Sequence, residues 1–187
     1  FVYGPIVNQL DSSLNISGNL TVGGYALTNS GAATLAVTAG TTSGIVTLTN
    51  TSTAPAGVSI ASGATLAADD VSNAAVAAIS NNGALTSKNV IQNLGALSNG
   101  VTGTISGGIN NTGGLYSLGK LNGALTNSAG GQVSISGALD GPVLNQESAG
   151  LTVIGDLEVK NNTFEITGAS AVVVDTGAVT GISTLTN

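Results

Sequence analysis

Aliphatic residues alternate with small polar residues along most of this chain. Leu14 and Ile16 lie two residues apart, as do Val133 and Ile135, and serine, threonine, asparagine and glycine fill the positions around them. A period of two residues is typical of a β-strand with one buried face. The sequence therefore predicts many short strands, each of about four to six residues.

Glycine-containing dipeptides separate these segments, and the segments resemble one another. GIVTLTN at 44–50 returns as GISTLTN at 181–187, and GAL opens segments at 83, 95, 123 and 137. Glycine and asparagine tolerate positive φ, so they suit corners where a strand turns onto a new face. Two such units would form a coil of roughly 20–25 residues, and the chain would then contain about eight coils.

Short strands with glycine corners are compatible with two architectures, a solenoid and a sandwich. Sandwich cores usually contain several aromatic residues, whereas this chain has three tyrosines, two phenylalanines and no tryptophan. Small and β-branched side chains stack well in a narrow parallel core, and repeated asparagines at the corners can form side-chain ladders between coils. The pattern favours an all-β fold, a right-handed parallel β-solenoid (β-helix), with a β-sandwich as the alternative.

The domain organisation follows from where the repeat pattern holds. Residues 1–13 do not match it and are interpreted as an N-terminal arm or cap, and residues 14–187 are interpreted as one solenoid domain. Residues 64–80 are rich in alanine, and their aliphatic residues share one helical face, so a short helix or a loop is expected to interrupt the stack. An alternating interpretation, with Ala74, Val76 and Ala78 on one face, also fits.

Composition removes several classes of function. Lysine and arginine number 3 against 9 acidic residues, which gives a net charge of −6, and histidine, cysteine and methionine are absent. Nucleic acids and anionic membrane surfaces both require clusters of basic residues. No apolar stretch is long enough to cross a bilayer. We therefore expect no nucleic-acid partner and no membrane insertion.

Candidate chemistry is sparse and acidic. The candidates for a calcium site are Asp69 with Asp70, and Asp156 with Glu158, but no calcium-binding loop motif accompanies either pair. Solvated surface charge is the simpler interpretation of both. Serine and threonine are abundant, but the histidine that most often activates them is missing. We expect no catalytic residue, no bound metal, no cofactor and no enzymatic activity.

The two ends of the chain suggest self-association. The N-terminal segment FVYGPIVNQL is apolar, and the chain ends in a strand-like unit. Exposed strand edges of this kind can join copies head to tail, and such contacts propagate into filaments. The expected interface residues are Phe1, Val2, Tyr3, Pro5, Ile6, Val7, Ile182 and Leu185. The alternative is that the N-terminal segment is only the lid of the first coil.

The segment NTGGLYSLGKLNGALTNSAGGQVSISGAL, residues 111–139, resembles the passenger regions of bacterial autotransporters and of filamentous-haemagglutinin-type exoproteins. The resemblance lies in the style of the repeat and extends over most of the chain from about residue 14. It implies a right-handed β-helix that is secreted and exposed on the cell surface. It also implies a role in adhesion, with host or cell-surface glycans or proteins as partners.

Together, these observations predict a non-enzymatic, extracellular structural subunit. It would assemble head to tail into a surface filament or biofilm matrix fibre by stacking strands between subunits. The alternative function is that of an adhesin passenger fragment, which displays loops for binding to cells or to a host.

Overall fold

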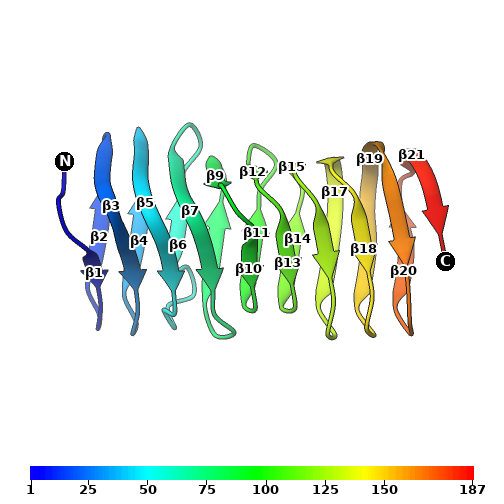
Figure 1. Ribbon diagram of the computed structural model, residues 1–187, viewed down its shortest axis with the longest axis horizontal. Helices are drawn as coiled ribbons and strands as arrows, with labels where there is room; N and C mark the ends of the chain where they lie inside the picture. Colours follow the sequence, from blue (N-terminus) through cyan, green and yellow to red (C-terminus); the bar gives the residue numbers. More distant parts are fainter.

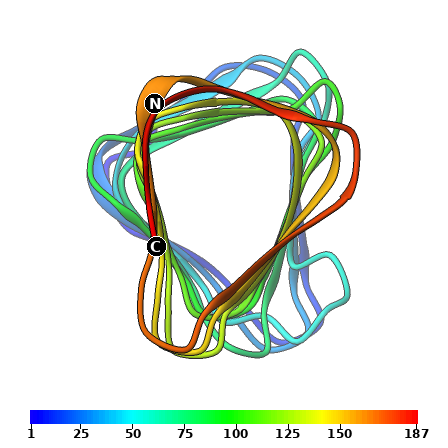
Figure 2. The same ribbon diagram turned by 90° about the vertical axis from the view of Figure 1, so that its right-hand side faces the viewer.

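The molecule is a stack of β-coils. The computed structural model describes all 187 residues, and each of its 21 regular elements is a β-strand, paired in parallel with strands of the neighbouring coils. Figure 1 shows the coils arranged along one long axis, with the two termini at opposite ends. In Figure 2 the C-terminal end faces the viewer and the chain winds counter-clockwise toward it. The fold is therefore a right-handed parallel β-solenoid, as the alternation predicts.

Each coil has three faces, which we call A, B and C in chain order (Figure 2). Face A contains β2 (Ser13–Ile16), β4 (Thr34–Val37), β6 (Val58–Ile60), β8 (Ala78–Asn81), β11 (Ala96–Asn99), β14 (Gly114–Ser117), the first parts of β17 (Gln132–Asp140) and β19 (Gly150–Ile166), and β20 (Ala171–Thr176). These nine strands mark nine coils.

Faces B and C share several long strands that bend at the corner between them. Face B contains the first parts of β3 (Leu20–Asn29), β5 (Thr41–Asn50), β7 (Thr65–Asn73) and β21 (Val179–Thr186), the strands β9 (Ala84–Ser87), β12 (Thr104–Ser106) and β15 (Lys120–Asn122), and later parts of β17 and β19. Face C contains β1 (Ile6–Asn8), β10 (Ile91–Asn93), β13 (Ile109–Asn111), β16 (Leu125–Asn127), β18 (Val143–Asn145) and the last parts of β3, β5, β7, β19 and β21.

Aliphatic side chains fill the interior in columns along the axis. The core is one cluster of 31 buried apolar residues. On face C one column runs through the whole stack: Ile6, Leu27, Leu48, Val71, Ile91, Ile109, Leu125, Val143, Phe164 and Leu185. Parallel in-register pairing places like residues over like residues, so one alternating pattern serves every coil.

A buried ladder of asparagines runs beside this column, at the corner where face C turns toward face A. Its members are Asn8, Asn29, Asn50, Asn73, Asn93, Asn111, Asn127 and Asn145. In every member except the last, Nδ2 donates to Oδ1 of the next asparagine over 2.7–3.1 Å. All eight Nδ2 groups also donate to backbone carbonyls at the corner. The ladder thus ties each corner to the next coil.

The number of residues between successive ladder asparagines gives the length of each coil. Successive members are 16 to 23 residues apart, because the corners differ in length while the strands keep their register. The expected coil length of 20–25 residues holds for four of these seven spacings and fails for three, and the stack has about nine coils where about eight were expected.

The alanine-rich segment 64–80 contains no helix. It forms β7, a turn and β8, so the expected interruption by a helix or loop is wrong. Its inward residues include Leu66, Val71, Ala77 and Ile79. The alternating interpretation had the correct period but the wrong phase, because Val76 lies exposed in the turn. Pairing with strands on both sides outweighs the weak helical preference of alanine.

Candidate functional site: the ends of the coil stack

The N-terminal arm lies on the chain's own first coil. Val2 forms a single parallel bridge to Val22, and β1 pairs with the end of β3, so that Ile6 lies over Leu27. The other edge of β1 pairs with no strand. The arm therefore adds an incomplete coil that covers face C and touches face B, and leaves face A bare.

An apolar hollow remains beside the arm. It has a volume of about 490 Å³, and its apolar lining comes from Leu14, Ile16 and Leu20 of the first coil and from Val2 and Ile6 of the arm. It lies at the outer edge of β2, which pairs only with β4. No charged side chain lines it. The N-terminal end of the stack thus presents core residues with no coil on top of them.

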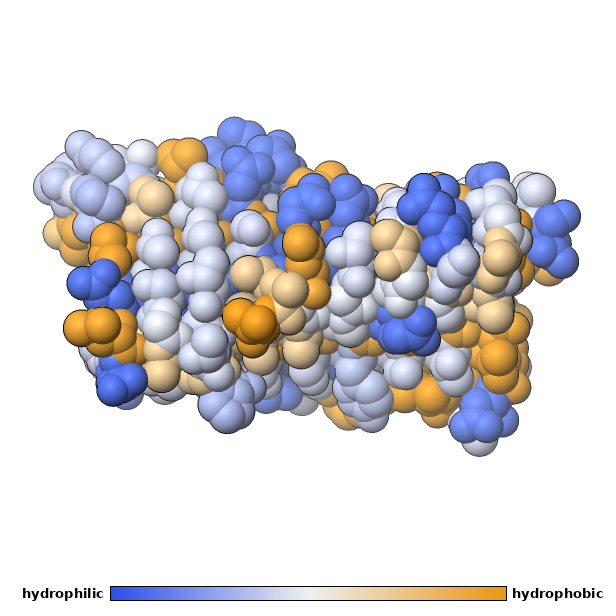
Figure 3. All heavy atoms as spheres, turned by 90° about the horizontal axis from the view of Figure 1, so that it is seen from below, coloured by the Kyte–Doolittle hydropathy of each residue, from blue (hydrophilic) through white to orange (hydrophobic).

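At the C-terminal end, the last residues of the same core columns are exposed. Val172 and Val174 of β20 lie over Leu151 and Val153, and Leu185 of β21 lies over Phe164. These inward positions are buried in the preceding coils, whereas Val174 is 50% exposed and Leu185 is 63% exposed. Figure 3 shows strongly apolar residues at both ends of the stack, on the side where face C turns toward face A.

The expected interface residues divide between these two ends. Phe1 and Tyr3 stack on each other at a ring-centroid distance of 6.1 Å and are 85% and 81% exposed. Pro5 and Val7 are also exposed, and Val2 and Ile6 are half-buried against the first coil. Ile182 and Leu185 lie at the far end, on the last coil. The structure therefore brings the residues together in two groups, one at each end of the molecule (Figure 1).

The asparagine ladder confirms the expectation that corner asparagines form side-chain ladders between coils, but the sequence reasoning did not identify which asparagines take part. Every face C strand up to β18 ends in the pattern aliphatic–any residue–asparagine, and the same tripeptide also ends β8 and β11 on face A. The pattern continues at Leu185–Asn187. Thr186 pairs with Glu165, which places Asn187 opposite Ile166, the residue next to Asn145 in the ladder column. Both ends of the stack thus carry an asparagine at the ladder position.

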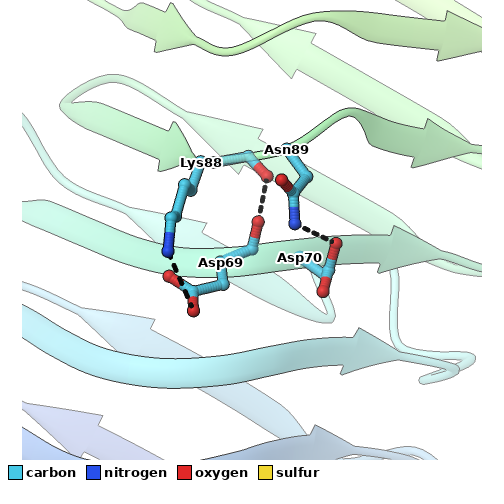
Figure 4. A network of polar contacts seen from close by, with 5 residues as sticks. Asp69, Asp70, Lys88 and Asn89 are labelled. Carbon is cyan, nitrogen blue, oxygen red and sulfur yellow. Dashed lines mark hydrogen bonds and ion pairs between the residues drawn. The ribbon is translucent and has the colours of Figure 1, made fainter.

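The acidic calcium candidates lie in two separate places. Asp69 and Asp70 are on β7, where Lys88 lies 3.8 Å from the Asp69 carboxylate and Asn89 donates to Asp70 over 2.9 Å (Figure 4). Asp156 is on β19 and accepts from the backbone N–H of Ala178, and Glu158 follows it two residues later. No group of three or more acidic, histidine or cysteine side chains comes together. The Asp69–Lys88 pair is largely exposed, so its contribution to stability is below about 1 kcal/mol.

A shallow trough runs along the outer surface of face A. Its volume is about 540 Å³, and its floor consists of small residues of β8, β11 and β14. Pro55 and Ala56, in the turn before β6, lie at one end, and Tyr116 and Gln132 lie toward the other. No charged residue lines it. It is larger than the hollow of about 330 Å³ beside Asp69 and Lys88.

Comparison with protein-family models, with curated proteins and with solved structures finds no match for this chain. The structure contains no helix of the length and hydrophobicity needed to cross a membrane.

Proposed function

We propose that this chain is a non-enzymatic structural subunit that stacks head to tail into a filament or matrix fibre outside the cell. The observation that carries the proposal is the match between the two ends. The core columns of faces A and C run the length of the stack and are open at both ends, with Leu14 and Ile16 at one end and Val174 and Leu185 at the other.

Stacking would extend interactions that already repeat between the coils. A strand of the last coil of one subunit would pair in parallel with a strand at the first coil of the next, as in strand addition. Burial of an exposed aliphatic side chain contributes about 1.5–3 kcal/mol, and several such residues face the junction at each end. The contact joins two different surfaces, so it does not close on itself and propagates along the axis.

The surface chemistry is consistent with an extracellular location. Three lysines and no arginine leave few cleavage sites for basic-specific proteases, and the absence of cysteine and methionine removes the side chains most sensitive to oxidation. These properties suit a durable external material. They support the proposal without identifying the cell that makes it.

A matched pair of variants on β21 tests the stacking. Leu185 points inward at the end of the stack, and its neighbour Thr186 lies on the outward side of the same strand. We expect the 187-residue chain to form rods that lengthen with concentration, and Leu185→Lys to remain monomeric because the junction would bury a charge. Thr186→Lys should assemble like the parent chain. Sedimentation velocity and negative-stain electron microscopy measure both.

The proposal has a clear failing result. If the parent chain sediments as a monomer at every concentration and shows no rods, end-to-end stacking is wrong. Equal assembly of Leu185→Lys and Thr186→Lys would show that any rods join by other surfaces.

The trough on face A favours the alternative function, an adhesin fragment that binds cell or host glycans or proteins. Its lining combines hydroxyl and carboxamide groups with the 46% exposed Tyr116 ring and has no charge, which suits a neutral glycan. If this function is correct, Tyr116→Ala should lower binding to immobilised neutral glycans at least tenfold without changing assembly. Absence of binding by the parent chain in a glycan screen would remove this support.

A further inference from the structure

The arm and the C-terminal strand carry the same pattern. Ile6–Asn8 and Leu185–Asn187 both read aliphatic–any residue–asparagine, the tripeptide of the face C strands. In the stack, Ile6 is the first member of the face C column and Leu185 is the last. The two segments are therefore chemically equivalent as partners for a face C strand.

The arm occupies the edge that an incoming subunit would need. Ile6 lies over Leu27, which is fully buried, and the Asn8 Nδ2 donates to Asn29 Oδ1 over 2.7 Å and to the carbonyl of Thr34 over 2.8 Å. In a seamless stack, Leu185 of another copy would lie over Leu27, and Asn187 would lie beside Asn29. The arm supplies these contacts from within the same chain.

The number of strands on each face decides between two ways of joining. Face A has nine strands and face C has ten, because β1 adds a level to face C that face A lacks. If β21 stacked on the free edge of β1, faces B and C would meet while face A remained one strand short, at the hollow beside β2. Without β1, each face has nine strands, and β20 and β21 can pair with β2 and β3 at once.

We infer that the arm is a built-in competitor of assembly, and that subunits join by exchanging β1 for β21 of a second copy. This inference rests on the proposed stacking. In the single chain the arm covers face C of the N-terminal end and limits association. At a junction it leaves the coil, and all three faces then continue into the next subunit.

A reversible lock on the arm tests the exchange. Val7 and Thr28 are register partners on the outer side of face C, and neighbouring strands lie about 4.8 Å apart, within the range that a disulfide can span. The chain has no cysteine, so Val7→Cys with Thr28→Cys introduces a single pair. We expect the oxidised protein to stay monomeric and the reduced protein to form rods.

The control lock lies one coil further along. Thr28 also pairs with Thr49 on β5, so Thr28→Cys with Thr49→Cys ties two coils that never separate. This variant should assemble equally when oxidised and when reduced. Circular dichroism of all four forms establishes that each disulfide leaves the fold intact.

A third variant distinguishes exchange of β1 for β21 from stacking of β21 on the free edge of β1, because the two predict opposite effects on assembly. Ile6→Asp weakens the arm on its own coil, so the exchange predicts rods at a concentration at least tenfold lower than for the parent chain. Stacking on the edge of β1 predicts the reverse, because Ile6 would then lie in the junction. Equal assembly of the oxidised and reduced Val7–Thr28 lock, or inhibition by Ile6→Asp, overturns the exchange and leaves stacking standing. If no form assembles, both the exchange and the proposed function are wrong.

Discussion

Replacement of Asn93 by leucine is expected to lower the free energy of unfolding by about 3 kcal/mol, because it interrupts the buried ladder at its middle. The Asn93 Nδ2 donates to Asn111 Oδ1 over 2.7 Å, and its Oδ1 accepts from Asn73 Nδ2 over 2.8 Å. Leucine has the same branched shape and the same number of side-chain heavy atoms but neither donates nor accepts. Asn111 Oδ1 would then lie buried without its donor, and desolvation of such a group costs about 1–3 kcal/mol.

The control for this prediction is the preceding residue. Gln92 lies on the outward side of the same strand and is exposed, so Gln92→Leu should change stability by less than about 0.5 kcal/mol. Urea denaturation followed by circular dichroism compares the two variants with the parent chain. If Asn93→Leu were as stable as Gln92→Leu, the ladder would contribute packing only, and its hydrogen bonds would be energetically neutral.

A second large effect is expected at Gly95, the corner residue that precedes β11. A Cβ atom at this position would contact the carbonyl oxygens of Ala74 and Ala77 in the coil below. Neither carbonyl can move freely, because the Ala77 oxygen accepts from the N–H of Ala96 and the Ala74 oxygen accepts from the N–H of Ala77, each over 2.9 Å. Gly95→Ala should therefore cost about 3 kcal/mol through backbone displacement.

Gly114 provides the matched substitution one coil later. It starts β14, directly over Ala96, and a Cβ atom there would meet nothing within 4 Å. Its φ is not positive, so Gly114→Ala should be neutral or should stabilise the protein by up to about 1 kcal/mol through reduced unfolded-state entropy. Thermal melting of the two variants tests the contrast. Equal melting temperatures would mean that the corner at Gly95 adapts at no cost.

The alternation of aliphatic and polar residues was sufficient to predict strands, their short length and the solenoid. It was sufficient because each strand buries one side only, so the inward positions must be apolar wherever the strand lies in the coil. Val133 and Ile135, expected to share a face, are both buried in β17. The few aromatic residues also favoured the correct architecture over a sandwich.

The spacing of the coils could not be predicted from the GAL units. Gly83 and Gly137 lie between faces A and B, Gly95 lies between faces C and A, and Gly123 lies between faces B and C. The unit marks a corner in general, so its spacing does not report the coil length. The tripeptide that ends in asparagine is not specific to one corner either, because it also ends β8 at Asn81 and β11 at Asn99 on face A, so its spacing alone does not report the coil length.

The sequence by itself determined the kind of fold. The two-residue period gives each strand one inward side, glycine supplies the corners, and the few aromatic residues could not fill the core of a β-sandwich. It also determined a weakly charged surface that contains no histidine. The tertiary structure alone decided which corner each glycine occupies, that residues 64–80 stay in the sheet, and which eight asparagines form one ladder. It also decided that β1 lies on its own first coil. These outcomes depend on register between coils, and register is set by the pairing of strands 16 to 23 residues apart rather than by any local pattern.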